Sequence, residues 1–184
     1  MISERAKRSL DQWVQDGLQT ALTHPDDPVR NLDTVPALSD LRETHVVMLS
    51  VASYRFRLML LIYFSPDDAT RAHFARSKQI APSELTSKAL DDAICEASNM
   101  CCGAFNRALG QVFPHLGMST PNIVDRRCAN HLHLMGFGHL QHFRLQLGSG
   151  MQFHASLCVS EYDTLDFEAQ HLAPAPTTGE LEFF

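Results

Sequence analysis

Apolar residues recur at helical spacing through residues 83–109, and this pattern predicts a long amphipathic helix. Ser83 suits the start of this helix, and Gly110 suits its end. One side of the helix is apolar and carries Leu90, Ile94, Ala97, Cys101, Ala104, Phe105 and Ala108. The opposite side carries a narrow stripe of Asp92, Glu96, Asn99 and Gly103. We therefore expect the apolar side to pack against a sheet and Glu96 and Asn99 to be exposed.

Two further helices are predicted from the same kind of pattern. Residues 1–22 carry apolar side chains at helical spacing, and Ser3 is a suitable cap. Residues 65–68, with the sequence SPDD, combine a capping residue, a proline and two acids, which favour the first turn of a helix that runs to about Ser77. Residues 24–36 contain three prolines and several turn-forming residues, so we expect a loop or connector there.

The other apolar stretches are rich in β-branched and aromatic residues, which is typical of strands. Strands are expected at residues 45–51, 54–64, 122–124, 140–147 and 151–159, the last two forming a hairpin. The order of helices and strands predicts an α+β fold, in which an antiparallel β-sheet is packed by long α-helices.

We expect one domain made of three consecutive parts. Residues 1–43 supply the N-terminal helix and connector, and residues 44–160 form the core with which that helix packs. Residues 161–184 are acidic and rich in proline and threonine, which predicts a mobile tail. Its aromatic residues are the part of the tail most suited to docking on a neighbour.

Composition excludes several classes of protein. The chain has 184 residues and a formal net charge of −6, without the basic surface of a nucleic-acid-binding protein. Its longest apolar run, residues 58–64, is too short to cross a membrane, and its start lacks the apolar segment of a signal peptide. Neighbouring cysteines of the central helix point in different directions, so we expect reduced thiols in a cytoplasmic protein rather than disulfides.

The polar stripe is part of a longer motif, which reads Asp92-x-x-x-Glu96-x-x-Asn99-Met100-x-x-Gly103. Downstream of this motif, Pro121 lies at the start of a predicted strand. This motif resembles the signature of the CheC/CheX/FliY family of chemotaxis phosphatases. Segments resembling CheX-like proteins also include LMLLIYF, SPDDAT, LGMSTPNIV and LQLGSGMQFHASLCV. The resemblance covers residues 44–159, and the single Glu–Asn pair is similar to CheX rather than CheC.

The resemblance implies a phosphatase that hydrolyses the aspartyl phosphate of a CheY-like receiver domain. It makes Glu96 and Asn99 the catalytic residues, with the Asn99 carboxamide positioning the attacking water and Glu96 pairing with a lysine of the receiver. Partner binding is assigned to Asp92, Met100, Gly103 and Pro121. The resemblance also implies a homodimer without a cofactor of its own, because the receiver holds the divalent metal, Mg²⁺.

Other interpretations of the same residues stay open. Exposed polar residues on a helix need no function beyond solvation, and Met100 suits a packing role. The alternative function is a non-catalytic receiver-docking adaptor or a flagellar-switch-like binding module. The pairing of Glu96 with Asn99 favours the enzyme, because a scaffold has no need of both.

The histidines raise the question of a metal site. Six of the ten lie between His115 and His154, and His131 and His133 would share one face of a strand. Neither Cys-x-x-Cys nor His-Glu-x-x-His accompanies them, so we expect solvated histidines and no metal site.

Overall fold

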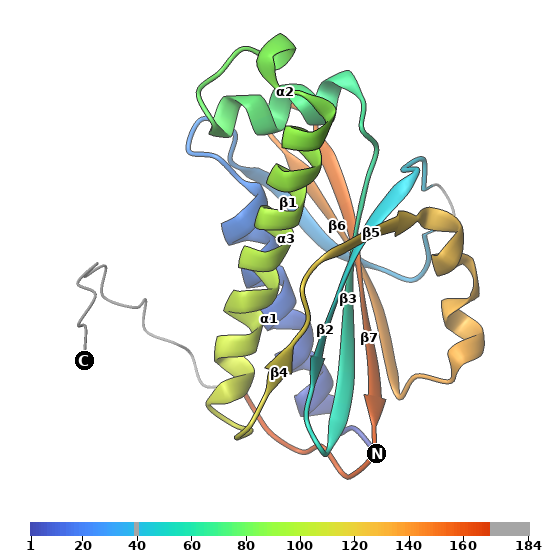
Figure 1. The fold of residues 1–184 in the computed structure, drawn as a ribbon. Coiled ribbons are helices and arrows are strands. Elements are labelled where there is room, and N and C mark those ends of the chain that lie inside the picture. Colours follow the sequence, from blue (N-terminus) through green and yellow to red (C-terminus); the bar gives the residue numbers. More distant parts are fainter. Residues whose placement is uncertain (39–40, 170–184) are drawn as a thin grey trace.

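The structure, a computed structural model, describes residues 1–38 and 41–169 (Figure 1). Its helices are α1 (Glu4–Leu22), α2 (Asp68–Ser77) and α3 (Ser87–Gly110), with the 3-10 helices η1 (Pro82–Glu84) and η2 (Arg126–Met135). Its strands are β1 (Val29–Val35), β2 (His45–Ala52), β3 (Phe56–Phe64), β4 (Gly117–Met118), β5 (Asn122–Asp125), β6 (His139–Leu147) and β7 (Gln152–Glu161). The α+β prediction is confirmed.

The strands form one antiparallel sheet in the order β1-β6-β7-β3-β2-β4, and β5 also pairs with β2. Helices α1 and α3 lie side by side against one face of this sheet, and η2 lies on the other face (Figure 1). The short helix α2 crosses the end of the helical layer at which α1 finishes and α3 begins (Figure 1). One side of α3 is therefore left facing solvent.

Side-chain alternation in β2 divides the core between the two faces of the sheet. Val47, Leu49 and Val51 are buried among the helices, whereas Val46 belongs to a smaller cluster on the opposite face. That smaller cluster is covered by Leu132 of η2. The sheet thus has a thick helical layer on one side and a thin cover on the other.

The predicted N-terminal helix and C-terminal hairpin are confirmed. Ser3 caps α1, because its hydroxyl accepts a hydrogen bond from the Ala6 backbone N–H at 3.2 Å. In α2 the cap is Asp67 rather than Ser65, and its carboxylate accepts from the Thr70 N–H at 2.9 Å. A carboxylate is favoured over a hydroxyl there because it also complements the positive end of the helix.

The predicted start of the central helix is wrong. Residues 82–84 form the separate turn η1, and α3 begins only at Ser87. Thr86 is the cap, since its hydroxyl accepts from the Ala89 N–H at 3.2 Å. The intervening Leu85 is extended and buried, so the chain turns into the core before the helix can start.

Two segments have a different secondary structure from the one predicted: a predicted loop contains a strand, and a predicted strand is a helical turn. Residues 24–36 contain β1, which pairs antiparallel with β6, because Pro28 and Pro36 lie just outside the strand and leave its ladder intact. His131 and His133 lie on η2 and not on a strand, because Asp125 caps a helical turn by accepting from the Arg127 N–H.

Residues 161–169 pack against the body of the protein, contrary to the mobile tail that we expected. Leu165 is buried and pairs with Ile2 at the start of the chain. The ring of Phe167 stacks on Trp13 of α1 with a centroid separation of 5.5 Å. This apolar burial holds the segment in place. The remainder of the expected tail lies outside the described residues. Within the described part of the chain, no helix is both long enough and apolar enough to cross a membrane.

Candidate functional site

The buried side of α3 is the one that the apolar pattern predicts. The buried side chains include Leu90, Ile94, Ala97, Cys101, Phe105 and Ala108, while Ala104 is half-buried. Ser98 and Cys102 are buried as well, so the covered side of α3, which packs against both α1 and the sheet, is wider than the predicted apolar side. Packing against α1 and against the sheet therefore sets the direction in which the free side of α3 faces.

The α3 stripe, defined as Asp92, Glu96, Asn99 and Gly103, lies on the free side. Its three polar side chains are exposed, which confirms the predicted exposure of Glu96 and Asn99. No hydrogen bond or ion pair within residues 1–38 and 41–169 engages the Glu96 carboxylate or the Asn99 carboxamide. Both groups are available to a partner or to water.

Two further features border the stripe. The Met100 side chain is 53% exposed. At Gly103 an added Cβ would meet only the Arg107 Nη1, at 3.8 Å, so the backbone there is open to close approach. Pro121 is half-buried at the start of β5, in the sheet layer, and is the one predicted site residue outside α3.

A groove of about 390 Å³ opens beside Glu96 and Met100. We name it the α3 groove; its other walls are the ends of α1 and α2, where Phe74 of α2 and the residues that directly follow the two helices, Thr23 and Lys78, line it. No signal in the sequence marks these residues as part of one site, because they belong to elements that only the tertiary fold brings together.

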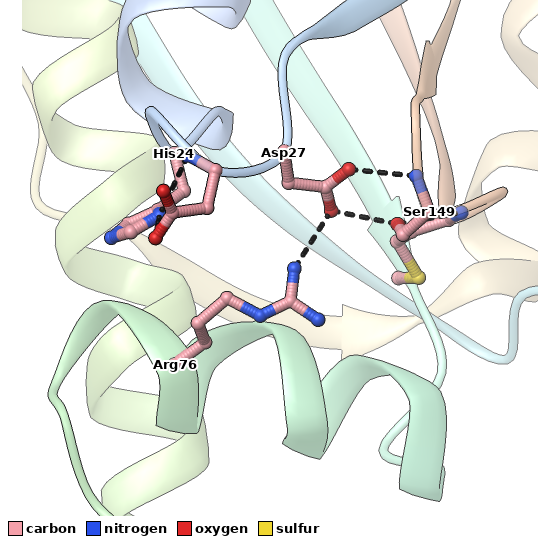
Figure 2. A network of polar contacts seen from close by, with 6 residues as sticks. His24, Asp27, Arg76 and Ser149 are labelled. Carbon is pink, nitrogen blue, oxygen red and sulfur yellow. Dashed lines mark hydrogen bonds and ion pairs between the residues drawn. The ribbon is translucent and has the colours of Figure 1, made fainter.

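A buried carboxylate, Asp27, holds two walls of the α3 groove in place (Figure 2). The backbone N–H and the hydroxyl of Ser149 each donate to it at 2.7 Å, and Arg76 of α2 donates at 3.2 Å. Burial by itself raises the pKa of Asp27, but these donors outweigh it and lower that pKa overall. Asp27 thereby ties the exit of α1 to α2 and to the β6–β7 turn.

His73 of α2 lines the same groove from its inner side. Its ring is 8% exposed and lies edge-on to Phe74 and Phe153. The buried Nδ1 has no hydrogen-bond partner among the described residues. Burial lowers the pKa of His73, and the Asp27 carboxylate opposes this shift only in part. The ring is therefore neutral at neutral pH.

The groups that the α3 stripe offers are a carboxylate, a carboxamide and open backbone. A carboxamide both donates and accepts hydrogen bonds, so it can hold a water molecule in a fixed direction. A carboxylate is suited to a lysine or arginine of a partner. In the part of the chain that the structure describes, no group of three or more His, Cys, Asp or Glu side chains is placed to hold a metal ion.

Solved structures with the same arrangement of helices and strands come from chemotaxis proteins. CheX from Vibrio vulnificus is 14% identical, with a TM-score of 0.57 over 83% of this chain and 97% of CheX. The chain also matches the CheX–CheY–BeF3–Mg²⁺ complex from Borrelia burgdorferi, with 10% identity and a TM-score of 0.58 over 84% of this chain and 97% of that one. FliY from Thermotoga maritima is 11% identical, with a TM-score of 0.50 over 87% of this chain and 91% of FliY.

This chain has the CheX/CheC-like fold. No protein-family model matches the sequence, and no curated protein is significantly similar to it.

The match to CheX covers 83% of the chain and so extends beyond residues 44–159, on which the sequence resemblance rests. In this chain helix α1 packs along α3 in the same layer (Figure 1). At these identities the likeness concerns the fold, and any function must be argued from the α3 stripe.

Proposed function

We propose that this chain is a phosphatase that hydrolyses the aspartyl phosphate of a CheY-like receiver domain. The observation that carries the proposal is the exposed, unpaired Glu96 and Asn99, one helical turn apart on α3 of a CheX-like fold. A receiver-binding role is further supported by the CheX–CheY complex among the structures that share the fold.

Hydrolysis of an aspartyl phosphate requires few catalytic groups from the phosphatase itself. An aspartyl phosphate has a good leaving group, so no general acid has to protonate it. The receiver's own metal and lysine stabilise the transferring phosphoryl group. What is missing is a water held in line with the bond that breaks, and positioning it removes much of the entropic part of the barrier. The Asn99 carboxamide holds this water by accepting one of its hydrogens or donating to its oxygen.

Glu96 fixes the docking register of the two proteins. Its carboxylate pairs with a lysine beside the receiver's phosphorylation site, and this ion pair sets the distance at which Asn99 meets the phosphoryl group. Gly103 allows the receiver backbone to approach α3 closely, and Asp92, Met100 and Pro121 contribute to the contact surface. The expected homodimer stays a prediction.

The decisive experiment measures phosphate release from a panel of phosphorylated CheY-like receivers under single-turnover conditions. Wild-type protein should accelerate release, and Asn99→Ala should lower the maximal rate about a hundredfold while leaving receiver affinity nearly unchanged. Asp91→Ala is the matched control, because Asp91 is exposed on the same helix but lies off the α3 stripe.

Two outcomes would count against the enzyme. If Asn99→Ala keeps the full maximal rate, Asn99 does not position the water. If wild-type protein binds a receiver carrying the phosphate mimic BeF3 but accelerates no dephosphorylation, the chain is a receiver-docking adaptor.

A further inference from the structure

A cavity of about 510 Å³ lies on the face of the sheet opposite α3, beneath η2. Its floor is formed by Tyr63 of β3 and by Leu140 and His142 of β6, and its roof by residues of η2. This volume is within the range of cavities that bind small organic molecules. The cavity is separate from the α3 stripe and from the α3 groove, because the sheet lies between them.

The floor contains a buried chain of hydrogen bonds. The Tyr63 hydroxyl lies 3.0 Å from Ser156 Oγ, which in turn lies 2.7 Å from Nδ1 of His142. Ser156 is fully buried, and its hydroxyl is the only partner of the Tyr63 hydroxyl among the described residues. The Ser156 hydroxyl carries a single proton, so in this chain it donates to one of its two partners and accepts from the other.

The direction of donation decides which end of the chain presents a free proton to the cavity. When Ser156 donates to Nδ1 of His142, the proton of the neutral ring is on Nε2; when His142 donates to Ser156, the Tyr63 hydroxyl keeps its own proton free. Burial lowers the pKa of His142, which keeps the ring neutral at pH 7. Within the described residues neither Nε2 of His142 nor the Tyr63 hydroxyl has a further partner, so in either direction the chain ends on one N–H or O–H donor that is available to a ligand.

Arg126 of η2 supplies the charge. It is half-buried and lines the cavity, and its guanidinium has no hydrogen bond or ion pair within residues 1–38 and 41–169. The nearby carboxylate of Asp125 is already engaged by Arg127, at 2.9 and 3.0 Å. No Asp or Glu of the described residues lines the cavity, although the chain as a whole carries a net charge of −6.

From this arrangement we propose that the cavity binds a small organic carboxylate with an apolar body. The guanidinium of Arg126 and the free donor at one end of the Tyr63–Ser156–His142 chain bind the carboxylate, and side chains such as Leu38, Ala129 and Leu132 cover the apolar part. One fixed positive charge compensates a carboxylate fully, whereas the second charge of a phosphate monoester would be left unpaired in a half-buried site.

The test uses phenylbutyrate as the probe, with phenylbutyramide as its neutral counterpart and phenylbutyl phosphate as the phosphate arm. Binding is measured by calorimetry and located by the amide NMR signals of residues around the cavity. Phenylbutyrate should bind at least about tenfold more tightly than either of the other probes.

Arg126→Gln should reduce the affinity for phenylbutyrate to that of the amide. Arg57→Gln should leave it unchanged, because Arg57 is exposed on the same strand as Tyr63 and lies outside the cavity. Ala129→Trp should abolish binding of all three probes by filling the cavity, with circular dichroism confirming that each variant is folded.

The proposal is overturned if phenylbutyrate shifts no signals around the cavity at about 10 mM. It is also overturned if the amide or the phosphate binds as tightly as the carboxylate, or if Arg126→Gln and Ala129→Trp both bind like wild type. None of these outcomes depends on phosphatase activity.

Discussion

Gly17 of α1 lies directly against the main chain of Cys101 of α3. A Cβ placed on Gly17 would fall 2.9 Å from the Cys101 carbonyl oxygen and 3.1 Å from its sulfur. Backbone atoms cannot retreat as a flexible side chain can, so this contact sets how closely the two helices pack. Because Cys101 faces α1 here, the α3 stripe on the opposite side of the helix is turned toward solvent.

Gly17→Ala should therefore destabilise the protein. We expect a loss of about 1–3 kcal/mol from the forced separation of α1 and α3, partly offset by the better helix propensity of alanine. Urea unfolding measures the change. Gly110→Ala is the control, because a Cβ there meets nothing within 4 Å. Equal stability of the two variants would contradict the close contact.

Gly103→Ala should have the opposite effect on stability. An added Cβ meets only Arg107 Nη1 at 3.8 Å, so the variant should be as stable as wild type or more stable by up to about 1 kcal/mol. If the receiver backbone approaches α3 at this point, the methyl group should weaken receiver binding. Titration of the variant with a receiver separates the two effects. Unchanged affinity would remove Gly103 from the proposed contact surface.

Glu96→Ala should weaken receiver binding about tenfold or more, because the proposed ion pair with the receiver is lost. Binding by wild-type protein should also weaken with added salt, and binding by Glu96→Ala should depend less on salt. Asp91→Ala, which removes another exposed carboxylate of α3, is the matched control. If both variants respond alike, general charge rather than a specific pair drives docking.

Asp27→Ala should destabilise the fold by about 3 kcal/mol, because it leaves Arg76 and the two Ser149 donors without their acceptor. The neighbouring Asp26→Ala should have almost no effect, since the Asp26 side chain is 82% exposed. Comparison of the two urea midpoints checks this. A loss confined to receiver binding, with unchanged stability, would mean that Asp27 does not hold the groove walls together.

The buried His73 should make the protein less stable on acidification. Its folded-state pKa is lowered, so below about pH 6.5 the unfolded chain takes up a proton that the folded protein resists. Stability should fall from pH 7 to pH 5, and His142, whose pKa is also lowered by burial, acts in the same direction. Asp27 adds to this loss of stability only below about pH 4, because its pKa in the folded protein is lowered from that of an ordinary carboxyl group.

The contribution of His73 is isolated by comparing pH profiles of unfolding. His73→Leu should flatten the profile between pH 5 and 7, because the variant lacks the buried ring whose pKa is lowered. Parallel profiles for wild type and His73→Leu would show that the buried ring is not what resists protonation.

Local patterns in the sequence determined much of the fold. The apolar side of α3, the Ser3 cap of α1 and the β6–β7 hairpin were all predicted from spacing and turn residues, because periodicity and capping act within a few residues. The same periodicity placed Glu96 and Asn99 together on the exposed side of one helix.

Contacts between distant segments could not be predicted in this way. Residues 24–36 lack a strong strand pattern, and β1 forms because β6 offers it an edge. The sequence marked the aromatic residues of the tail as suited to docking on a neighbour, but it did not show that Phe167 stacks on Trp13 of α1 or that Leu165 is buried in the same chain. Tertiary structure also decided the α3 groove and the cavity under η2, since each combines residues from elements that become neighbours only when the chain folds. Sequence periodicity shows which side of an element is apolar, but only packing decides what that side meets.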